Sequence, residues 1–160
     1  MESRSKGWGY RERGVHTILP KTGYTLHFQK MLIEINYTPF PAVRSNRNSW
    51  DKRTKAYHLK MKELRVILSP QIHEIAQAMV EDRWSVTFVL PIAKSTSKKK
   101  YQEMIGTYHK QRPDINNLVK SLEDCIFYKT EHNDCEVSTN NAKKIWGAEW
   151  KILFEIKDSN

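Results

Sequence analysis

The segment 113–127 constrains the fold of this sequence more than any other. An aspartate directly after a proline is a common start of a helix, because its carboxylate accepts hydrogen bonds from free backbone N–H groups. Apolar residues then recur at helical spacing: Ile115, Leu118, Val119, Leu122, Cys125 and Ile126. The other side of the helix carries Asn116, Asn117, Lys120 and Asp124. The pattern therefore predicts an amphipathic helix with one buried face and one polar face.

Other segments show the patterns of strands and further helices. Apolar, β-branched or alternating residues predict strands over 31–37, 84–90, 136–145 and 149–156, with Gly147 at the last turn. Trp150 is expected on the same face of its strand as Ile152, Phe154 and Ile156. Helical spacing predicts helices over 54–68 and 71–81, and the polar segment 94–112 is expected to be a functional or mobile loop. This order predicts an α+β domain with a mixed sheet and helices packed on one side.

The length of 160 residues suits one domain with a substantial core. Residues 1–30 are polar and basic, and we expect them to form an extension that orders on a partner, with 31–158 as the folded domain. The sequence has no run of about eighteen apolar residues and no apolar signal-peptide region, so no membrane segment is expected. Its two cysteines fit neither a zinc site nor a disulfide framework, which favours the cytoplasm.

Two acids and a lysine are candidates for phosphodiester chemistry. Asp114 lies where a loop becomes a helix, Asp134 precedes a predicted strand, and Lys120 lies on the polar helix face. Hard cations activate water and neutralise charge during phosphodiester cleavage, and Mg²⁺ needs only a few oxygen ligands because it retains several waters. Each residue also has an ordinary structural interpretation. Asp114 suits a helix cap worth about 1 kcal/mol, Asp134 a turn and Lys120 a solvated surface.

The runs RPDINNLVKSLEDCIF and NDCEV resemble the motif of the RusA family of Holliday junction resolvases. That motif reads Pro-Asp-x-Asp-Asn-Leu-x-Lys, then Asp, then Asp-Asp-x-Gln, and the similarity extends over residues 31–157. It implies a RusA-like fold, a homodimer that nicks two strands of a four-way DNA junction symmetrically, and Mg²⁺ or Mn²⁺ as the only cofactor. By position, it implies Asp114, Asn116 and Asp134 as metal ligands, Lys120 as the catalytic lysine, and a supporting role for Asp124.

Three positions depart from the family motif. Asn116 replaces the second aspartate, Asn133 replaces the first of two adjacent aspartates, and Glu136 stands where glutamine is usual. An asparagine carbonyl can coordinate Mg²⁺, but it contributes no charge. The sequence is therefore compatible with an active endonuclease or with a junction-binding protein whose cleavage is impaired at Asn116. Glu123 lies on the same side of the predicted helix as Asn116, so Glu123 and Glu136 are possible substitute acids.

Basic residues dominate the charge of the chain, which is +9 overall and favours a polyanionic partner such as nucleic acid. A solvated basic surface is the ordinary alternative. The candidates for contact with DNA phosphates are Arg44, Arg47, Lys52, Arg53, Lys98, Lys99, Lys100, Lys110 and Arg112. Such clusters bind phosphates without reading sequence, and interleaved aromatic residues such as Trp50, Tyr101 and Tyr108 suit stacking on bases. A basic RNA-binding domain whose acids are only caps and turns is a third interpretation.

Overall fold

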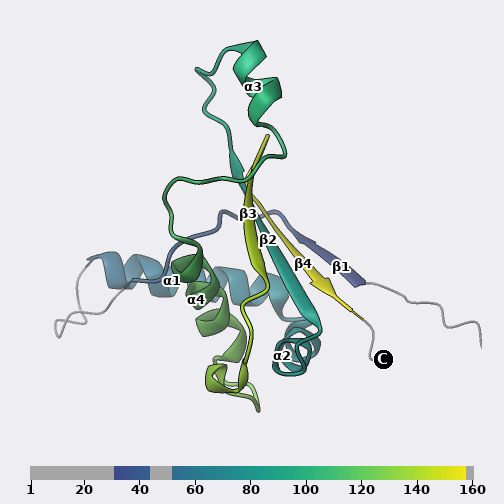
Figure 1. The fold of residues 1–160 in the computed structure, drawn as a ribbon. Coiled ribbons are helices and arrows are strands. Elements are labelled where there is room, and N and C mark those ends of the chain that lie inside the picture. Colours follow the sequence, from purple (N-terminus) through teal and green to yellow (C-terminus); the bar gives the residue numbers. More distant parts are fainter. Residues whose placement is uncertain (1–30, 44–51, 158–160) are drawn as a thin grey trace, which may run out of the picture.

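The computed structural model describes residues 31–43 and 52–157 and shows a mixed four-stranded sheet (Figure 1). The strands are β1 (Met31–Ile35), β2 (Trp84–Pro91), β3 (Ala142–Gly147) and β4 (Lys151–Ile156). They lie in the order β1-β4-β2-β3, with β2 and β3 parallel and the other two pairs antiparallel. The predicted α+β architecture with a mixed sheet is confirmed.

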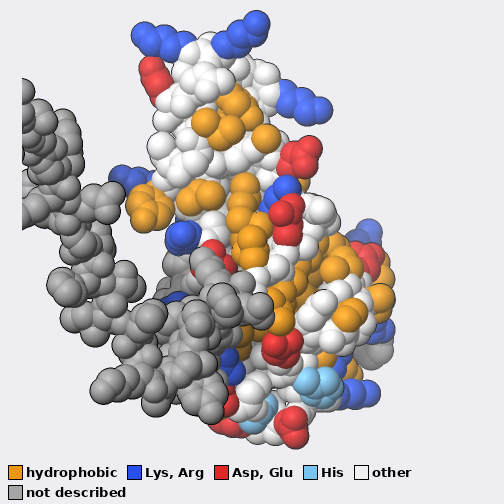
Figure 2. Space-filling view, turned by 90° about the vertical axis from the view of Figure 1, so that its right-hand side faces the viewer, with side chains coloured by type: hydrophobic (Ala, Val, Ile, Leu, Met, Phe, Trp, Pro, Cys, Tyr) orange, Lys and Arg blue, Asp and Glu red, His pale blue; other side chains and the backbone are white. Residues whose placement is uncertain are grey.

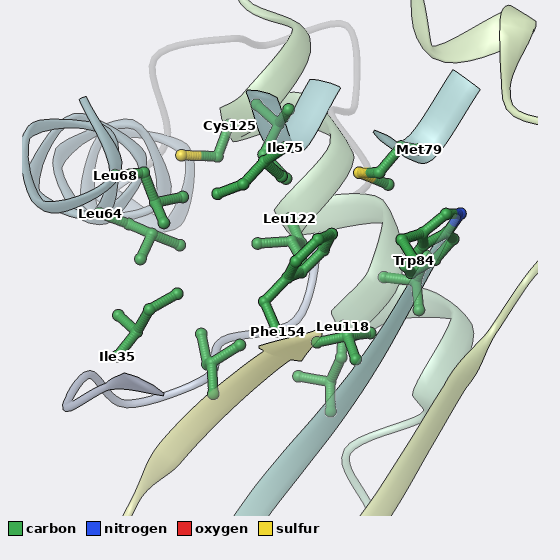
Figure 3. Packing of buried hydrophobic residues seen from close by; sticks show 14 of the residues in the cluster. Ile35, Leu64, Leu68, Ile75, Met79, Trp84, Leu118, Leu122, Cys125 and Phe154 are labelled. Carbon is green, nitrogen blue, oxygen red and sulfur yellow. The ribbon is translucent and has the colours of Figure 1, made fainter. Parts of the chain in front are cut away.

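Three longer helices, α1 (Lys52–Leu68), α2 (Ile72–Val80) and α4 (Ile115–Phe127), pack against one face of the sheet (Figure 1). Helix α4 lies at the centre of this layer and contacts both α1 and α2. Its predicted apolar face is buried, with Leu118, Leu122 and Ile126 at most 1% exposed. Figure 3 shows Leu118 and Leu122 close to Phe154 of β4. Burial of these side chains fixes which way the polar face of α4 points.

The predicted strand over 136–145 is wrong at its beginning. Residues Asp134–Glu136 form a short 3-10 helix, η1, and β3 begins only at Ala142. The backbone N–H of Asn133 donates to Glu136 Oε1 at 2.8 Å, which closes this turn. The side chain of Asn141, just before β3, donates to Asp82 Oδ1 at 2.7 Å. The chain therefore turns at η1 and enters the sheet only at β3.

Two details at the final turn also differ from the prediction. Gly147 is the last residue of β3 rather than a free turn residue, and a Cβ atom there would lie 2.2 Å from Val89 Cγ1. The close approach of β2 therefore requires glycine. Trp150 lies outside β4 and is 41% exposed, so it does not share the buried face of Ile152.

The segment predicted as a loop contains helix α3 (Lys98–Met104) and forms an arm, residues 93–108, that projects beyond the sheet (Figure 1). The Ser97 hydroxyl accepts from the backbone N–H of Lys100 and caps α3. The returning chain is fixed to β3, because Gly106 N donates to Trp146 O at 2.8 Å and Trp146 N donates to Thr107 O at 2.9 Å. The arm is thus attached through backbone hydrogen bonds. Within the described part of the chain, no helix has the length and apolar character to cross a membrane.

Candidate active site on the polar face of helix α4

Asp114 is the N-cap of α4. Its Oδ1 accepts from the backbone N–H groups of Asn116 at 2.9 Å and Asn117 at 3.4 Å, while the residue stays exposed to solvent. The structural role considered from the sequence is therefore present. The cap also fixes the orientation of the carboxylate at the positive end of the helix dipole, where negative charge is stabilised. Because the cap engages one oxygen, it does not prevent the exposed carboxylate from binding a cation.

Lys120 connects α4 to η1. Its Nζ donates to Asp134 Oδ2 and lies 3.0 Å from Asp124 Oδ1, one helical turn further along α4. The hydrogen bond with Asp134 raises the pKa of Lys120, and the same bond lowers the pKa of Asp134. The structure thus brings together two of the predicted catalytic residues, fourteen positions apart in sequence. Both are ionised over the ordinary range of assay pH.

The position of Asp134 depends on a hydrogen-bonded turn. His132 Nδ1 lies 3.1 Å from Glu136 Oε2, and His132 Nε2 lies 2.8 Å from Gln77 Oε1 on α2. Glu136 Oε1 is also engaged, by the backbone of Asn133, and this bond lowers the pKa of Glu136. Both oxygens of Glu136 therefore already stabilise the turn that carries Asp134. This arrangement does not favour Glu136 as a substitute metal ligand.

Asn116 faces a partner that sequence reasoning did not identify. Its Oδ1 accepts from Asn140 Nδ2 at 3.1 Å, so the side-chain oxygen points toward the segment that leads into β3. Among the described residues, no group of three or more His, Cys, Asp or Glu side chains is arranged to hold a metal. With asparagine at this position, Asp114 and Asp134 are the only acids in the predicted ligand set. Their oxygen-donor chemistry suits Mg²⁺, but their charge is low for a hard cation.

Glu123 is the other candidate for a substitute acid and lies close to this cluster. Burial raises the pKa of Glu123, Lys120 opposes that change, and Asp134 and Asp124 add to it. The carboxyl group therefore lies within electrostatic range of both Lys120 and Asp134. Glu123 stays a candidate for adding negative charge near Asp134, as the helical spacing from Asn116 predicted, although burial favours its neutral form.

An open pocket of about 880 Å³ lies beside the start of α4. Its lining includes Lys110, Arg112, Asp114, Asn117 and Lys144. The predicted basic residues Lys110 and Arg112 are exposed here, and Lys144, which sequence reasoning missed, joins them from β3. Three cations around one open pocket make it electropositive despite the single aspartate. This is the charge distribution expected where a phosphate backbone approaches.

The segment leading into α4 is held in place by β3. Lys144 Nζ donates to Pro113 O at 2.5 Å and also to Gln111 O. His109 is 5% exposed, its ring centroid lies 3.9 Å from that of Trp146, and its Nδ1 accepts from Gln111 N at 3.3 Å. Burial and the nearby Lys144 lower the pKa of His109. Its contacts indicate a structural role rather than direct contact with a phosphate.

The remaining basic candidates lie in two further places. Lys52 and Arg53 begin α1, and Lys98, Lys99 and Lys100 form the exposed first turn of α3. Figure 2 shows Lys and Arg side chains gathered around the end of the arm. Arg44, Arg47 and Trp50 lie outside the described residues. The two cysteines that suggested a reducing compartment are free thiols, with Cys125 buried and Cys135 exposed.

Comparison with known proteins agrees with the motif. The family model described as endodeoxyribonuclease RusA matches residues 37–157, which include α1, α4, η1 and every strand except β1. Neither the curated proteins nor the solved structures gave a significant match. The matched region contains Asp114, Asn116, Lys120 and Asp134. The chain belongs to the RusA endodeoxyribonuclease family.

Proposed function

We propose that this protein is a divalent-metal-dependent endonuclease that resolves four-way DNA junctions by paired nicks, acting in recombination and repair. The observation that carries the proposal is the hydrogen bond between Lys120 on α4 and Asp134 on η1. This bond keeps Lys120 protonated and Asp134 ionised, and an electropositive pocket lies beside the start of the same helix. Membership of an endodeoxyribonuclease family supplies the reaction class.

The family motif and the chemistry of each side chain suggest a role for each residue of the site. Asp114, Asn116 and Asp134 would hold Mg²⁺ or Mn²⁺ through oxygen atoms, and a bound cation would supply water activation and charge neutralisation. Lys120 retains Asp124 as a second carboxylate partner, so its ammonium group stays protonated and near the site. An ammonium group placed there stabilises negative charge on a phosphate in the transition state. Lys110, Arg112 and Lys144 suit contacts with flanking phosphates.

A nicking assay tests this function. With a synthetic four-way junction, a linear duplex of the same sequence and a Mg²⁺ titration, we expect nicks in two opposing strands of the junction and little cutting of the duplex. Parallel reactions with Mn²⁺ and with a chelator measure the metal requirement. Tight junction binding without nicking at any metal concentration would favour the alternative, a junction-binding protein impaired at Asn116. Stronger binding to structured RNA than to the junction would favour an RNA-binding domain.

The specific observation that favours the alternative, a junction-binding protein with impaired cleavage, is the asparagine at position 116. Its side-chain oxygen is engaged by Asn140, and a neutral amide stands where the family motif has a carboxylate. Junction binding depends on the basic surfaces and does not require the missing charge. The alternative therefore predicts normal affinity for the junction and weak cleavage.

A homodimer is part of the proposal, because paired nicks need two sites related by symmetry. On the face of the sheet opposite the core, Val89, which is only 8% exposed, lies beside Ile145. Tyr108, which is 69% exposed, pairs with Ile145 at the base of the arm. The described helices α1, α2 and α4 pack on the core face of the sheet (Figure 1), and Figure 2 shows hydrophobic side chains grouped on the arm and below it. We therefore propose this face as the contact between two copies. Sedimentation equilibrium should give twice the chain mass of 18.9 kDa.

The arm is expected to contribute to DNA affinity through phosphate contacts. Replacing Lys98, Lys99 and Lys100 with Ala should flatten the slope of log K against log salt by roughly 0.9 for each lost contact. The preference for a junction over a duplex should largely survive, since phosphate contacts do not read structure by themselves. Filter binding or fluorescence anisotropy over a salt series measures both quantities.

A second triple variant controls for the loss of three charges. Lys62, Lys129 and Lys157 are exposed and lie away from the arm and the pocket. Their joint replacement with Ala should leave the slope nearly unchanged. An equal flattening in both triple variants would mean that net charge, and not contact by the arm, controls the affinity.

A further inference from the structure

A tyrosine on α1 connects to the candidate site through two hydrogen-bonded steps. The Tyr57 hydroxyl donates to Asp124 Oδ2 at 2.7 Å, and the other oxygen of the same carboxylate lies 3.0 Å from Lys120 Nζ. Lys120 in turn donates to Asp134. Four side chains from three separate elements therefore form one continuous chain, which begins in the core and ends at the acid on η1. Neither the sequence motif nor the roles proposed above include Tyr57.

The Tyr57 hydroxyl, at the buried end of this hydrogen-bonded series, is fixed in position. Tyr57 is 8% exposed, and its ring packs edge-on against Phe40 with centroids 5.6 Å apart. Burial, together with the hydrogen bond to Asp124, raises the pKa of Tyr57. The hydroxyl therefore remains a protonated donor at every ordinary assay pH. Since the ring cannot move without disturbing the core, Asp124 has a rigid anchor on one of its two oxygens.

Lys120 needs such an anchor more than a shorter side chain would. Its ammonium group ends a flexible four-carbon chain, and the lysine side chain is 47% exposed. Isolated ion pairs between exposed residues one helical turn apart hold their partners only weakly. If Asp124 could rotate freely, Lys120 would sample several positions. With Oδ2 held by Tyr57, Oδ1 presents a fixed acceptor toward Lys120.

We propose that Tyr57 is a positioning residue for the nuclease site, which orients Lys120 by holding the Asp124 carboxylate in one rotamer. This inference rests on the proposed function for its catalytic consequence, but the orientation of Lys120 is a property of the metal-free protein. A purely structural role is the competing interpretation, in which the bond between Tyr57 and Asp124 only fastens α1 to α4. The two interpretations differ in what happens at Lys120.

A second tyrosine, Tyr37, provides a matched control for the removal of one tyrosine hydroxyl. The Tyr37 hydroxyl donates to Glu63 Oε2, also at 2.7 Å, and the ring of Tyr37 likewise packs edge-on against Phe40. Burial raises the pKa of Tyr37 as well. This bond fastens α1 to the segment after β1 and does not involve Lys120. Tyr37→Phe therefore removes the same kind of interaction without affecting the candidate site.

The first measurement is kinetic. Tyr57→Phe should lower kcat for junction nicking roughly tenfold and leave KM unchanged, in line with the losses seen when a group that orients an active-site ligand is removed. Tyr37→Phe should leave both constants unchanged. In an Asp124→Asn background, Tyr57→Phe should have little further effect, because both changes break the same connection. Equal losses of kcat in the two tyrosine variants would overturn the proposal.

The second measurement does not depend on cleavage. The side-chain carbon and nitrogen NMR signals of Lys120, assigned with Lys120→Arg, report the mobility of this side chain in the metal-free protein. Tyr57→Phe should increase the mobility of Lys120, whereas Tyr37→Phe should leave it unchanged. Unchanged Lys120 signals in Tyr57→Phe would overturn the proposal. If the protein nicks no junction, this measurement still decides whether Tyr57 positions Lys120. Failure of the positioning proposal is therefore distinguishable from failure of the proposed function.

Discussion

Asp134→Asn is expected to reduce junction cleavage by at least about a hundredfold, roughly 2.7 kcal/mol of barrier. The substitution removes one of the two acids in the predicted ligand set and one of the two carboxylate partners of Lys120. Affinity for the junction should stay equal or increase. A carboxylate near a phosphate repels it when no cation lies between them, and the change also frees Lys120 for the DNA.

Two controls separate this effect from a loss of charge or of folding. Glu131→Gln removes the same charge from an exposed position in the same loop and should leave cleavage unchanged. A melting curve checks that Asp134→Asn is folded. If the unmodified protein cleaves only weakly, the effect of Asp134→Asn is measured in an Asn116→Asp background, where faster cleavage is expected. Loss of junction binding with a normal melting curve would instead identify Asp134 as a DNA-positioning residue.

The parts of the fold that depend on local pattern could be predicted from the sequence. Helix α4 combines an aspartate cap with apolar residues at helical spacing, and both features are contained within fourteen residues, from Asp114 to Phe127. The predicted strands at the positions of β1 and β2 have short apolar runs. In contrast, α3 has three lysines in its first turn and no buried residue, so no apolar periodicity marks it. Its one local signal is the Ser97 cap.

The sheet region shows where tertiary contacts override local preference. Residues just before β3 include Thr139 and Asn141, whose side chains both bond to Asp82 in the turn that precedes β2. A partner 57 or 59 positions away cannot be identified from the pattern of one segment. The order of the strands has the same origin, since the parallel pairing of β2 with β3 follows a connection that contains both α3 and α4.

The same distinction applies to the candidate site. Asp114, Lys120 and Asp134 carry the motif, and the structure joins the latter two directly. Tyr57 lies in a helix that the sequence predicts only from helical spacing, yet its hydroxyl reaches a residue 67 positions away. Asn140 likewise joins the site through a contact across 24 positions. Residues that support a site through long-range hydrogen bonds carry no spacing signal of their own, so only the structure reveals them.

Asn116→Asp decides between an endonuclease and an impaired junction binder. We expect it to raise the rate of junction nicking by at least about tenfold, roughly 1.4 kcal/mol of barrier. Asp114 and Asp134 supply two negative charges, and affinity for a hard cation rises with the number of charged ligands. Asn140 Nδ2, which now donates to Asn116 Oδ1, can donate to a carboxylate in the same way, so the local structure should be retained. Binding of the junction without metal should weaken slightly through added repulsion.

Asn117→Asp is the matched control, because it adds the same charge to the neighbouring exposed residue on the same turn of α4. It should leave the Mg²⁺ dependence of nicking unchanged, whereas Asn116→Asp should shift it to lower Mg²⁺ concentration. If Asn116→Asp cleaves no faster at any Mg²⁺ concentration, Glu123→Gln separates two explanations. Loss of an already robust activity in Glu123→Gln would show that Glu123 supplies the missing charge. Weak activity in all of these variants would mean that Asp114 and Asp134 do not form a metal site, and the resolvase proposal would fail.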